Sequence, residues 1–181
     1  MSDGPQIVLG VSGSIAAYKA AEIVRLMVAR GWGVSVMMTE AATRYVGPLT
    51  FRALTGRPVS QGRFEAMDES TFQHIDLAER ADAMLIAPAT ANVMAKIAHG
   101  LADDIVTATV LAYRGPLLLA PAMNTGMWTS PATQSNVEQL KARDVQVLDV
   151  GEGELACGAV GAGRLSPPLD IVDAVARTLG A

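Results

Sequence analysis

The sequence has few aromatic residues, a single cysteine and no surplus of basic charge. Aromatic residues make up 4% of its 181 residues, which argues against an all-β sandwich and favours close-packed, alanine-rich helices. Cys157 is the one cysteine, so an internal disulfide is excluded and a reducing compartment is expected. The 14 basic and 18 acidic side chains leave a net charge of −4, which argues against nucleic-acid binding because nucleic acids require a basic surface.

Long apolar runs are also missing. No stretch approaches the ~18 consecutive apolar residues of a membrane-spanning helix. The first residues, Met1 to Pro5, lack the basic and apolar regions of a secretory signal. Half of the chain is hydrophobic, which is enough for a substantial core in one domain covering residues 1–181. We therefore expect a soluble, cytoplasmic domain that binds neither membrane nor nucleic acid, and we assign no metal ligands.

Short apolar runs alternate with amphipathic segments along the chain. Strands are expected at residues 7–11, 34–38, 84–87, 117–120 and 145–150. Helices are expected at residues 15–30, 40–46, 48–55, 74–81, 92–99, 102–113, 131–143 and 169–179, with loops at 60–73 and 151–163. This alternation predicts an α/β fold in which helices cover both faces of a parallel sheet. In such sheets a ligand binds beyond the carboxyl ends of the strands.

Two turns at predicted strand ends could bind a ligand. The turn from Gly10 to Ile15 consists of small residues, so its backbone could approach a phosphate at a helix start. Its spacing matches neither the dinucleotide G-x-G-x-x-G motif nor a Walker loop, and a plain tight turn is the alternative. Thr90 follows another strand and either binds a ligand or only caps the next helix.

Three further residues could carry chemistry, and each has a structural alternative. Asn124 lies between two methionines and beside a tryptophan, where its amide could bind a carboxylate or could form a turn. His74 opens a predicted helix and could exchange a proton near neutral pH, or it could be structural. Cys157 lies in a glycine-dense loop, which favours a thiol on a flap that closes over a substrate rather than an inert buried thiol.

Taken together, five segments make the chain resemble a known family. In order they read VSGSIAAYK, HIDLAERAD, APATAN, PAMNTGMW and ELACGAVGAGRL. The chain is similar over nearly its whole length to the homo-oligomeric flavin-containing cysteine decarboxylases, above all to the phosphopantothenoylcysteine decarboxylases among them. The last two segments are the most specific. The resemblance implies a three-layer, Rossmann-like flavoprotein fold. Flavin prenyltransferases share this fold, but they do not fit these two segments.

The resemblance also implies a role for each matching residue. Asn124 would hold the carboxylate of a cysteine-terminated small-molecule substrate, with Met127 beside it. His74 would be the catalytic histidine, and Cys157 would donate a proton from the flap. The residues that would bind the FMN cofactor are Gly13, Ser14, Ile15, Thr39, Thr90, Ala91, Asn92, Val93 and Ala122.

The implied reaction is the decarboxylation of a C-terminal cysteine. Oxidation of its thiol carbon, with hydride transfer to FMN, provides the electron sink that CO2 loss requires. Re-reduction of the ene-thiol then converts 4'-phosphopantothenoylcysteine to 4'-phosphopantetheine in coenzyme A biosynthesis. The alternative is a peptidyl-cysteine decarboxylase, which stops at the ene-thiol. The intact ACG segment around Cys157 favours the coenzyme A reaction.

The resemblance implies partners as well. Members assemble as homotrimers or homododecamers with the flavin between subunits, and many bacterial members are fused to a phosphopantothenate–cysteine ligase. Some relatives are non-catalytic inhibitory subunits of protein phosphatases, but they carry long acidic extensions that this sequence does not have. Lys19, Arg80 and Arg164 are candidates for contacting the substrate phosphate, with no preference among them.

Overall fold

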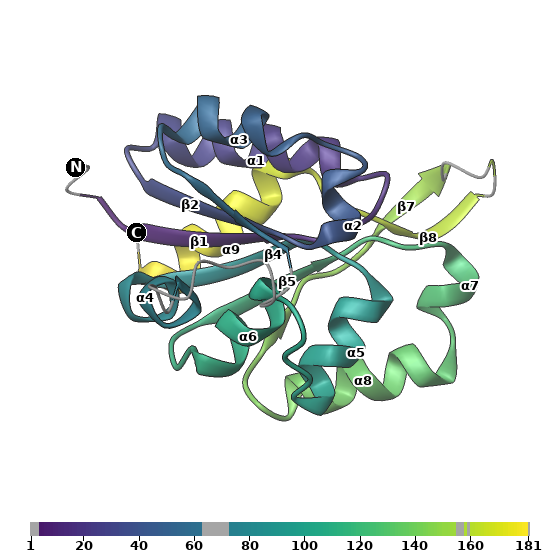
Figure 1. Cartoon of the computed structure of the whole chain (residues 1–181). Coiled ribbons are helices and arrows are strands. Elements are labelled where there is room, and N and C mark those ends of the chain that lie inside the picture. Colours follow the sequence, from purple (N-terminus) through teal and green to yellow (C-terminus); the bar gives the residue numbers. More distant parts are fainter. Residues whose placement is uncertain (1–3, 63–72, 155–157, 159, 181) are drawn as a thin grey trace.

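The computed structural model describes residues 4–62, 73–154, 158 and 160–180. Its main sheet is parallel, with strand order β3-β2-β1-β4-β5-β6 (Figure 1). These strands are β1 (Gln6–Val11), β2 (Gly33–Met38), β3 (Val59–Gln61), β4 (Ala83–Ala89), β5 (Leu117–Pro121) and β6 (Gln146–Val147). The predicted α/β class with a parallel sheet is therefore confirmed.

Helices cover both faces of this sheet, which gives three layers (Figure 1). On one face lie α1 (Ala17–Ala29), α3 (Pro48–Thr55) and α9 (Pro168–Leu179). On the other lie α4 (Gln73–Arg80), α5 (Ala91–His99), α6 (Ile105–Ala112) and α8 (Pro131–Lys141). Two single-turn helices, α2 (Glu40–Thr43) and α7 (Thr125–Trp128), follow β2 and β5.

The core is split by the sheet into two buried clusters. Successive strand residues point to opposite faces, so Leu9 and Val11 pack with α1 and α9, whereas Val8 packs with α5 and α6. The central strands are apolar on both faces, and β4 is buried along its whole length. This explains why they appear in the sequence as continuous apolar runs rather than as alternating patterns.

The structure corrects two expectations at the sheet edges. The expected loop began at residue 60, but Ser60 and Gln61 form the edge strand β3 (Val59–Gln61) together with Val59, beside β2. The expected strand at residues 145–150 contracts to Gln146–Val147, which pair with β5. Both edge strands are short and partly exposed, so the sequence shows no apolar run there. They are recognised as strands only by their pairing with a buried neighbouring strand.

The structure also corrects the expectation of a loop at residues 151–163. Strands β7 (Gly151–Glu154) and β8 (Val160–Arg164) pair antiparallel as a hairpin outside the main sheet. Gly153 and Gly163 have φ values of 136° and 132°, a backbone conformation that side chains disfavour. Because glycines occupy so many positions, these strands lack the alternation of apolar and polar residues by which a strand is recognised in a sequence. Helix α7 was not expected either.

The strand order reverses its direction of growth between β1 and β4. The chain moves outward from β1 to β2 and β3, and then returns to place β4 on the other side of β1. Ligands of parallel α/β sheets bind at such a switch point, beyond the carboxyl strand ends. Within the described residues, no helix combines the length and apolarity needed to cross a membrane.

Candidate functional site

The turns that follow β1 and β4 are joined by a buried serine. Ser12 is fully buried, and its Oγ donates to the Pro88 carbonyl oxygen at 2.7 Å and accepts from the Thr90 N–H at 3.0 Å. The Ser12 N–H also donates to the Pro88 carbonyl oxygen, at 3.3 Å. Ser12 therefore fixes the two turns of the switch point to one another.

Gly13 lets the first of these turns approach the helix after β2. A Cβ added to Gly13 would lie 2.5 Å from the Ala41 Cβ, closer than real Cβ atoms approach. The next residue, Ser14, accepts a hydrogen bond from the Ala16 N–H at 3.2 Å. Ile15 is 58% exposed. Gly13 thus allows the turn to pack closely against α2, which is a structural use of this small residue. The predicted approach of the turn to a phosphate stays a prediction.

Helices α5 and α6 begin at this edge with side-chain caps. Thr90 Oγ1 accepts from the Val93 N–H at 3.3 Å, and Asp104 Oδ1 accepts from the Thr107 N–H at 2.9 Å. Thr39 caps α2 in the same way through the Ala42 N–H. Capping explains these threonines structurally. Because a helix N-terminus carries partial positive charge, the start of α5 also favours an anionic group nearby.

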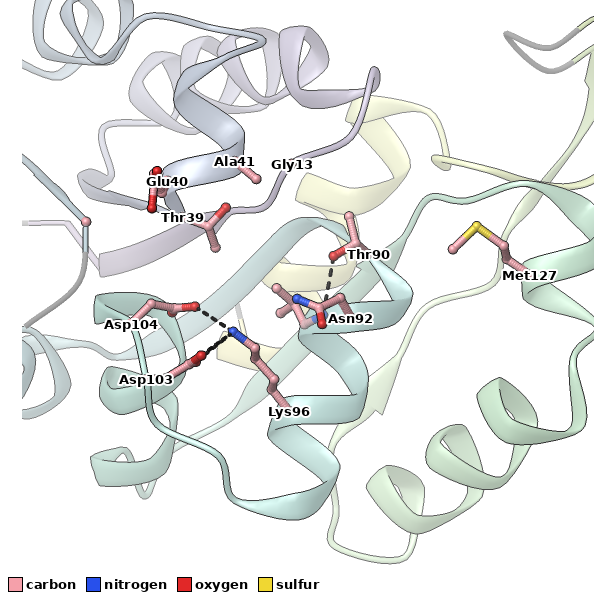
Figure 2. Close-up of a pocket in the computed structure, with 12 residues that line it drawn as sticks. Gly13, Thr39, Glu40, Ala41, Thr90, Asn92, Lys96, Asp103, Asp104 and Met127 are labelled. Atoms are coloured by element: carbon pink, nitrogen blue, oxygen red, sulfur yellow. Dashed lines mark hydrogen bonds and ion pairs between the residues drawn. The ribbon is translucent and has the colours of Figure 1, made fainter.

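A cavity of about 360 Å³ opens beside these turns (Figure 2). Six predicted site residues line it, namely Gly13, Thr39, Thr90, Asn92, Val93 and Met127. The rest of its lining consists of Glu40, Ala41, Gly62, Lys96, Asp103 and Asp104. Five chain segments that are distant in sequence therefore meet at one cavity, as expected for the carboxyl edge of the sheet.

Lys96 is held in the cavity wall by two carboxylates (Figure 2). Its Nζ lies 2.6 and 2.9 Å from the carboxylate oxygens of Asp103, and 3.4 Å from Oδ2 of Asp104. The pKa of Lys96 is raised above its ordinary value: burial alone would lower this pKa, but the hydrogen bonds and charges of Asp103 and Asp104 outweigh it. The ammonium form is therefore stabilised.

The segment with Asn124 lies next to the hairpin. Asn124 is exposed and caps α7, where its Oδ1 accepts from the Gly126 N–H at 2.8 Å. The Met123 N–H donates to the Gly163 carbonyl oxygen at 2.9 Å, which attaches β8 to this segment. The Ala122 N–H donates to the Ala89 carbonyl oxygen at 3.1 Å, so Ala122 is buried next to the turn that holds Thr90.

Several predicted residues do not line this cavity. They are Ser14, Ile15, Ala91, Ala122, Asn124 and His74. His74 is the second residue of α4, which packs against α6, and it is half-buried. Cys157 lies outside the described residues, in the connection between the paired residues Glu154 and Val160.

Sequence reasoning assigned no role to Ser12, Lys96, Asp103 or Asp104. The sequence held a signal for Asp104, because an aspartate followed three residues later by Thr107 can form a capping box at a helix start. The pairing of Lys96 with Asp103 crosses the turn between two helices. Its spacing has no periodic signature, so the sequence alone does not reveal it.

Comparisons with known proteins identify the family. The model of the family described as "Flavoprotein" matches residues 1–180. This chain belongs to the flavoprotein family. The crystal structure of SpaF, described as an FMN-dependent cysteine decarboxylase, is 32% identical, with a TM-score of 0.80, and the match covers 98% of this chain and 99% of SpaF. The chain is thus a member of the flavin-dependent cysteine decarboxylases, which confirms the resemblance drawn from its motifs.

Two further relatives extend the comparison. A PPC decarboxylase with a cysteine-to-serine mutation, complexed with pantothenoylaminoethenethiol, superposes with a TM-score of 0.87 at 28% identity, over 98% of this chain and 99% of that one. The "Coenzyme A biosynthesis bifunctional protein CoaBC" of Vibrio cholerae is 45% identical over 169 residues, or 93% of this chain. The match spans 42% of that protein, so this chain corresponds to less than half of the curated relatives that it matches.

Proposed function

We propose that this chain binds FMN and decarboxylates 4'-phosphopantothenoylcysteine to 4'-phosphopantetheine in coenzyme A biosynthesis. The observation that carries the proposal is its superposition, over 98% of its length, on a PPC decarboxylase that holds an ene-thiol ligand. The 45% identity to a coenzyme A biosynthesis protein supports the same pathway. The intact ACG segment around Cys157 of this chain supports the complete reaction rather than one that stops at the ene-thiol.

The cavity suits a flavin with a phosphate. Thr90 and Asn92 offer hydrogen-bonding groups for hydroxyls, while Val93 and Met127 offer apolar surface for a ring. The start of α5 suits an anion, and Gly13 lines the cavity with backbone atoms alone. When bound, FMN supplies the acceptor and donor of a hydride.

The remaining steps belong to side chains of this chain. The Asn124 amide carries two N–H donors that match a substrate carboxylate and hold it in place until CO2 departs. Met127 covers the cavity from α7. His74 exchanges a proton with the substrate. Cys157 supplies the proton that completes re-reduction of the ene-thiol.

We further propose that a second copy of the chain completes the site. His74 does not line the cavity of its own chain, although the proposed chemistry needs His74 and Asn124 at one substrate. A trimer, or a multiple of three, would supply His74 from a neighbouring copy. To test this, the inactive variants His74→Asn and Asn124→Asp are mixed, unfolded and refolded together. A shared site should recover about a quarter of wild-type activity, because random mixing gives that fraction of sites both native residues. No recovery, or a monomer by light scattering with FMN bound, would refute the shared site.

The substrate is tested by mass spectrometry. The purified protein should be yellow and should release FMN on denaturation. It is incubated with 4'-phosphopantothenoylcysteine or with a cysteine-terminated peptide, and loss of CO2 is measured. Turnover of the first substrate to fully reduced phosphopantetheine is expected. A colourless protein that takes up no FMN, or one that decarboxylates neither substrate, would refute the proposal.

A second candidate is a peptidyl-cysteine decarboxylase, which the 32% identity to SpaF favours. It predicts turnover of the peptide only, with a product that has lost two further hydrogens. The curated relatives are bifunctional, and we propose that this chain works with a phosphopantothenate–cysteine ligase, whose product is its substrate.

A further inference from the structure

The cavity wall contains a charge cluster that the proposed chemistry does not use. Lys96 projects from α5 into the wall, and Asp103 and Asp104 face it from the segment leading into α6 (Figure 2). The Lys96 side chain is 19% exposed, compared with 11% for Asp104 and 60% for Asp103. Two carboxylates and one ammonium give the cluster a formal charge of −1.

Asp104 cannot leave the cavity wall without cost. Its Oδ1 accepts hydrogen bonds from the Thr107 N–H at 2.9 Å and from the Thr107 hydroxyl at 3.1 Å, as part of the capping box of α6. The other acidic lining residue, Glu40, forms an exposed ion pair with Arg44 at 3.6 Å. Among the described lining residues, Lys96 is the one with a cationic side chain.

A phosphorylated ligand in this cavity would therefore lie near the carboxylates of Asp103 and Asp104, whose charges Lys96 partly offsets. Charges within about one Debye length of ~8–10 Å interact appreciably, and partly buried charges are screened less than exposed ones. Removal of the Lys96 charge would change the cluster from −1 to −2. The penalty would be borne by a ligand with a phosphate and not by the same ligand without it.

We propose that Lys96 is a specificity-determining residue that allows this cavity to accept a phosphorylated flavin, by offsetting the charges of Asp103 and Asp104. The inference rests on the proposed FMN binding and deepens it. Lys96 acts through charge compensation and needs no direct contact with the phosphate. The raised pKa of Lys96 agrees with this role, since the ammonium persists throughout the physiological range.

A purely structural role for Lys96 makes the opposite prediction for its partner. If the ion pair only braces α5 against α6, then loss of either member should weaken binding of every flavin. If charge compensation matters, Asp103→Asn removes one negative charge and should leave FMN binding unchanged or tighter. The double variant Lys96→Met with Asp103→Asn restores the cluster to −1, so it should regain FMN affinity.

The test uses the full chain, stripped of flavin and titrated with FMN or with riboflavin, which lacks the phosphate. The Kd for each flavin is measured by fluorescence quenching at low and high salt. Lys96→Met should weaken FMN binding about 10-fold at low salt, the size expected for one charge roughly 10 Å from another at an effective dielectric constant of about 20. Riboflavin binding should stay within about 2-fold, and high salt should shrink the FMN effect.

Two variants serve as controls. Lys141→Met removes the same charge from an exposed residue of α8 that does not line the cavity, and it should bind both flavins like wild type. Lys96→Arg keeps the charge and should keep the preference for FMN over riboflavin. If Lys96→Met does not fold, Asp103→Asn still tests the inference, because weakened FMN binding in Asp103→Asn contradicts charge compensation.

Three further results would overturn the inference. These are unchanged FMN affinity in Lys96→Met, an equal loss of FMN and riboflavin affinity in that variant, and no recovery in the double variant. If wild-type protein binds riboflavin but discriminates against FMN, the inference also fails. If it binds neither flavin, the proposed function fails first and the inference fails with it.

Discussion

Gly163 is the position at which one added methyl group should have the largest local effect. It is buried in β8 with φ at 132°. A Cβ at Gly163 would lie 2.3 Å from the Met123 carbonyl oxygen, and the Met123 N–H donates to the Gly163 carbonyl oxygen at 2.9 Å. The substitution Gly163→Ala should therefore disrupt the contact that attaches the hairpin to the segment carrying Asn124.

The magnitude follows from two costs. A non-glycine residue in a sparsely populated backbone region costs about 1–3 kcal/mol. The clash adds about 1–3 kcal/mol, because its partner is a backbone oxygen that cannot rotate away. The hairpin lies outside the main sheet, so we expect it to detach locally while the core stays folded. Even the smaller total, about 2 kcal/mol, raises the open population roughly 30-fold.

Hydrogen–deuterium exchange measured by mass spectrometry tests this expectation. Peptides covering residues 146–165 should exchange at least ~30-fold faster in Gly163→Ala, while peptides from β1 and β4 exchange as in wild type. Decarboxylation should fall with the loss of the hairpin contact. Gly151→Ala is the matched control in the same hairpin, because its nearest added contact is an ordinary 3.5 Å. Hairpin exchange in Gly163→Ala that equals the control would refute the reasoning.

Four further predictions concern single side chains. Asn124→Asp should keep FMN and lose decarboxylation, because a carboxylate repels the substrate carboxylate; near-normal turnover would remove Asn124 from the site. Cys157→Ser should still release CO2 but accumulate a product two mass units below phosphopantetheine, since a hydroxyl is less acidic than a thiol by roughly five or more pKa units; only fully reduced product at the wild-type rate would exclude Cys157 as the donor. Thr90→Val removes the cap of α5 and should lower the free energy of unfolding by about 1–2 kcal/mol in urea titrations, unless the bond to the Val93 N–H contributes nothing. Burial, with a smaller contribution from the charge of Asp82, raises the pKa of Tyr113 to about 12. The stability that the neutral Tyr113 contributes is therefore complete below the unfolded pKa of ~10 and is lost as pH rises towards 12. Between pH 9 and pH 11 wild type should lose about 1 kcal/mol more stability than Tyr113→Phe, and equal losses would contradict this.

The central architecture could be predicted from the sequence because its signals are local. The strands around Leu9 and Leu85 are continuous apolar runs, and a strand buried on both faces has that composition. Alternation of these runs with amphipathic segments left a parallel sheet as the natural arrangement. The rule that ligands bind beyond the carboxyl ends of parallel strands then predicted which edge of the sheet would hold the site, whereas the switch point between β1 and β4 came from the structure.

The motifs also indicated part of the site. Gly13, Thr39 and Thr90 follow strands whose carboxyl ends share one edge, and the fold brings them to one cavity. Sequence order could not tell whether Asn124 or His74 reaches the same cavity. In one chain neither lines it: Asn124 caps α7, of which only Met127 reaches the cavity, and His74 lies on α4, which packs against α6.

Only the tertiary structure decided which distant segments contact one another, because these segments share no sequence pattern. The hairpin of β7 and β8 pairs glycine-rich residues, and only a glycine fits at position 163 because the Met123 carbonyl oxygen lies where a Cβ would be. Ser12 links two turns 76 residues apart, and Lys96 meets Asp103 across a turn. A sequence records which groups are present and how they repeat. Hydrogen bonds and ion pairs depend on the distances between atoms, and those distances are set only when the whole chain has packed.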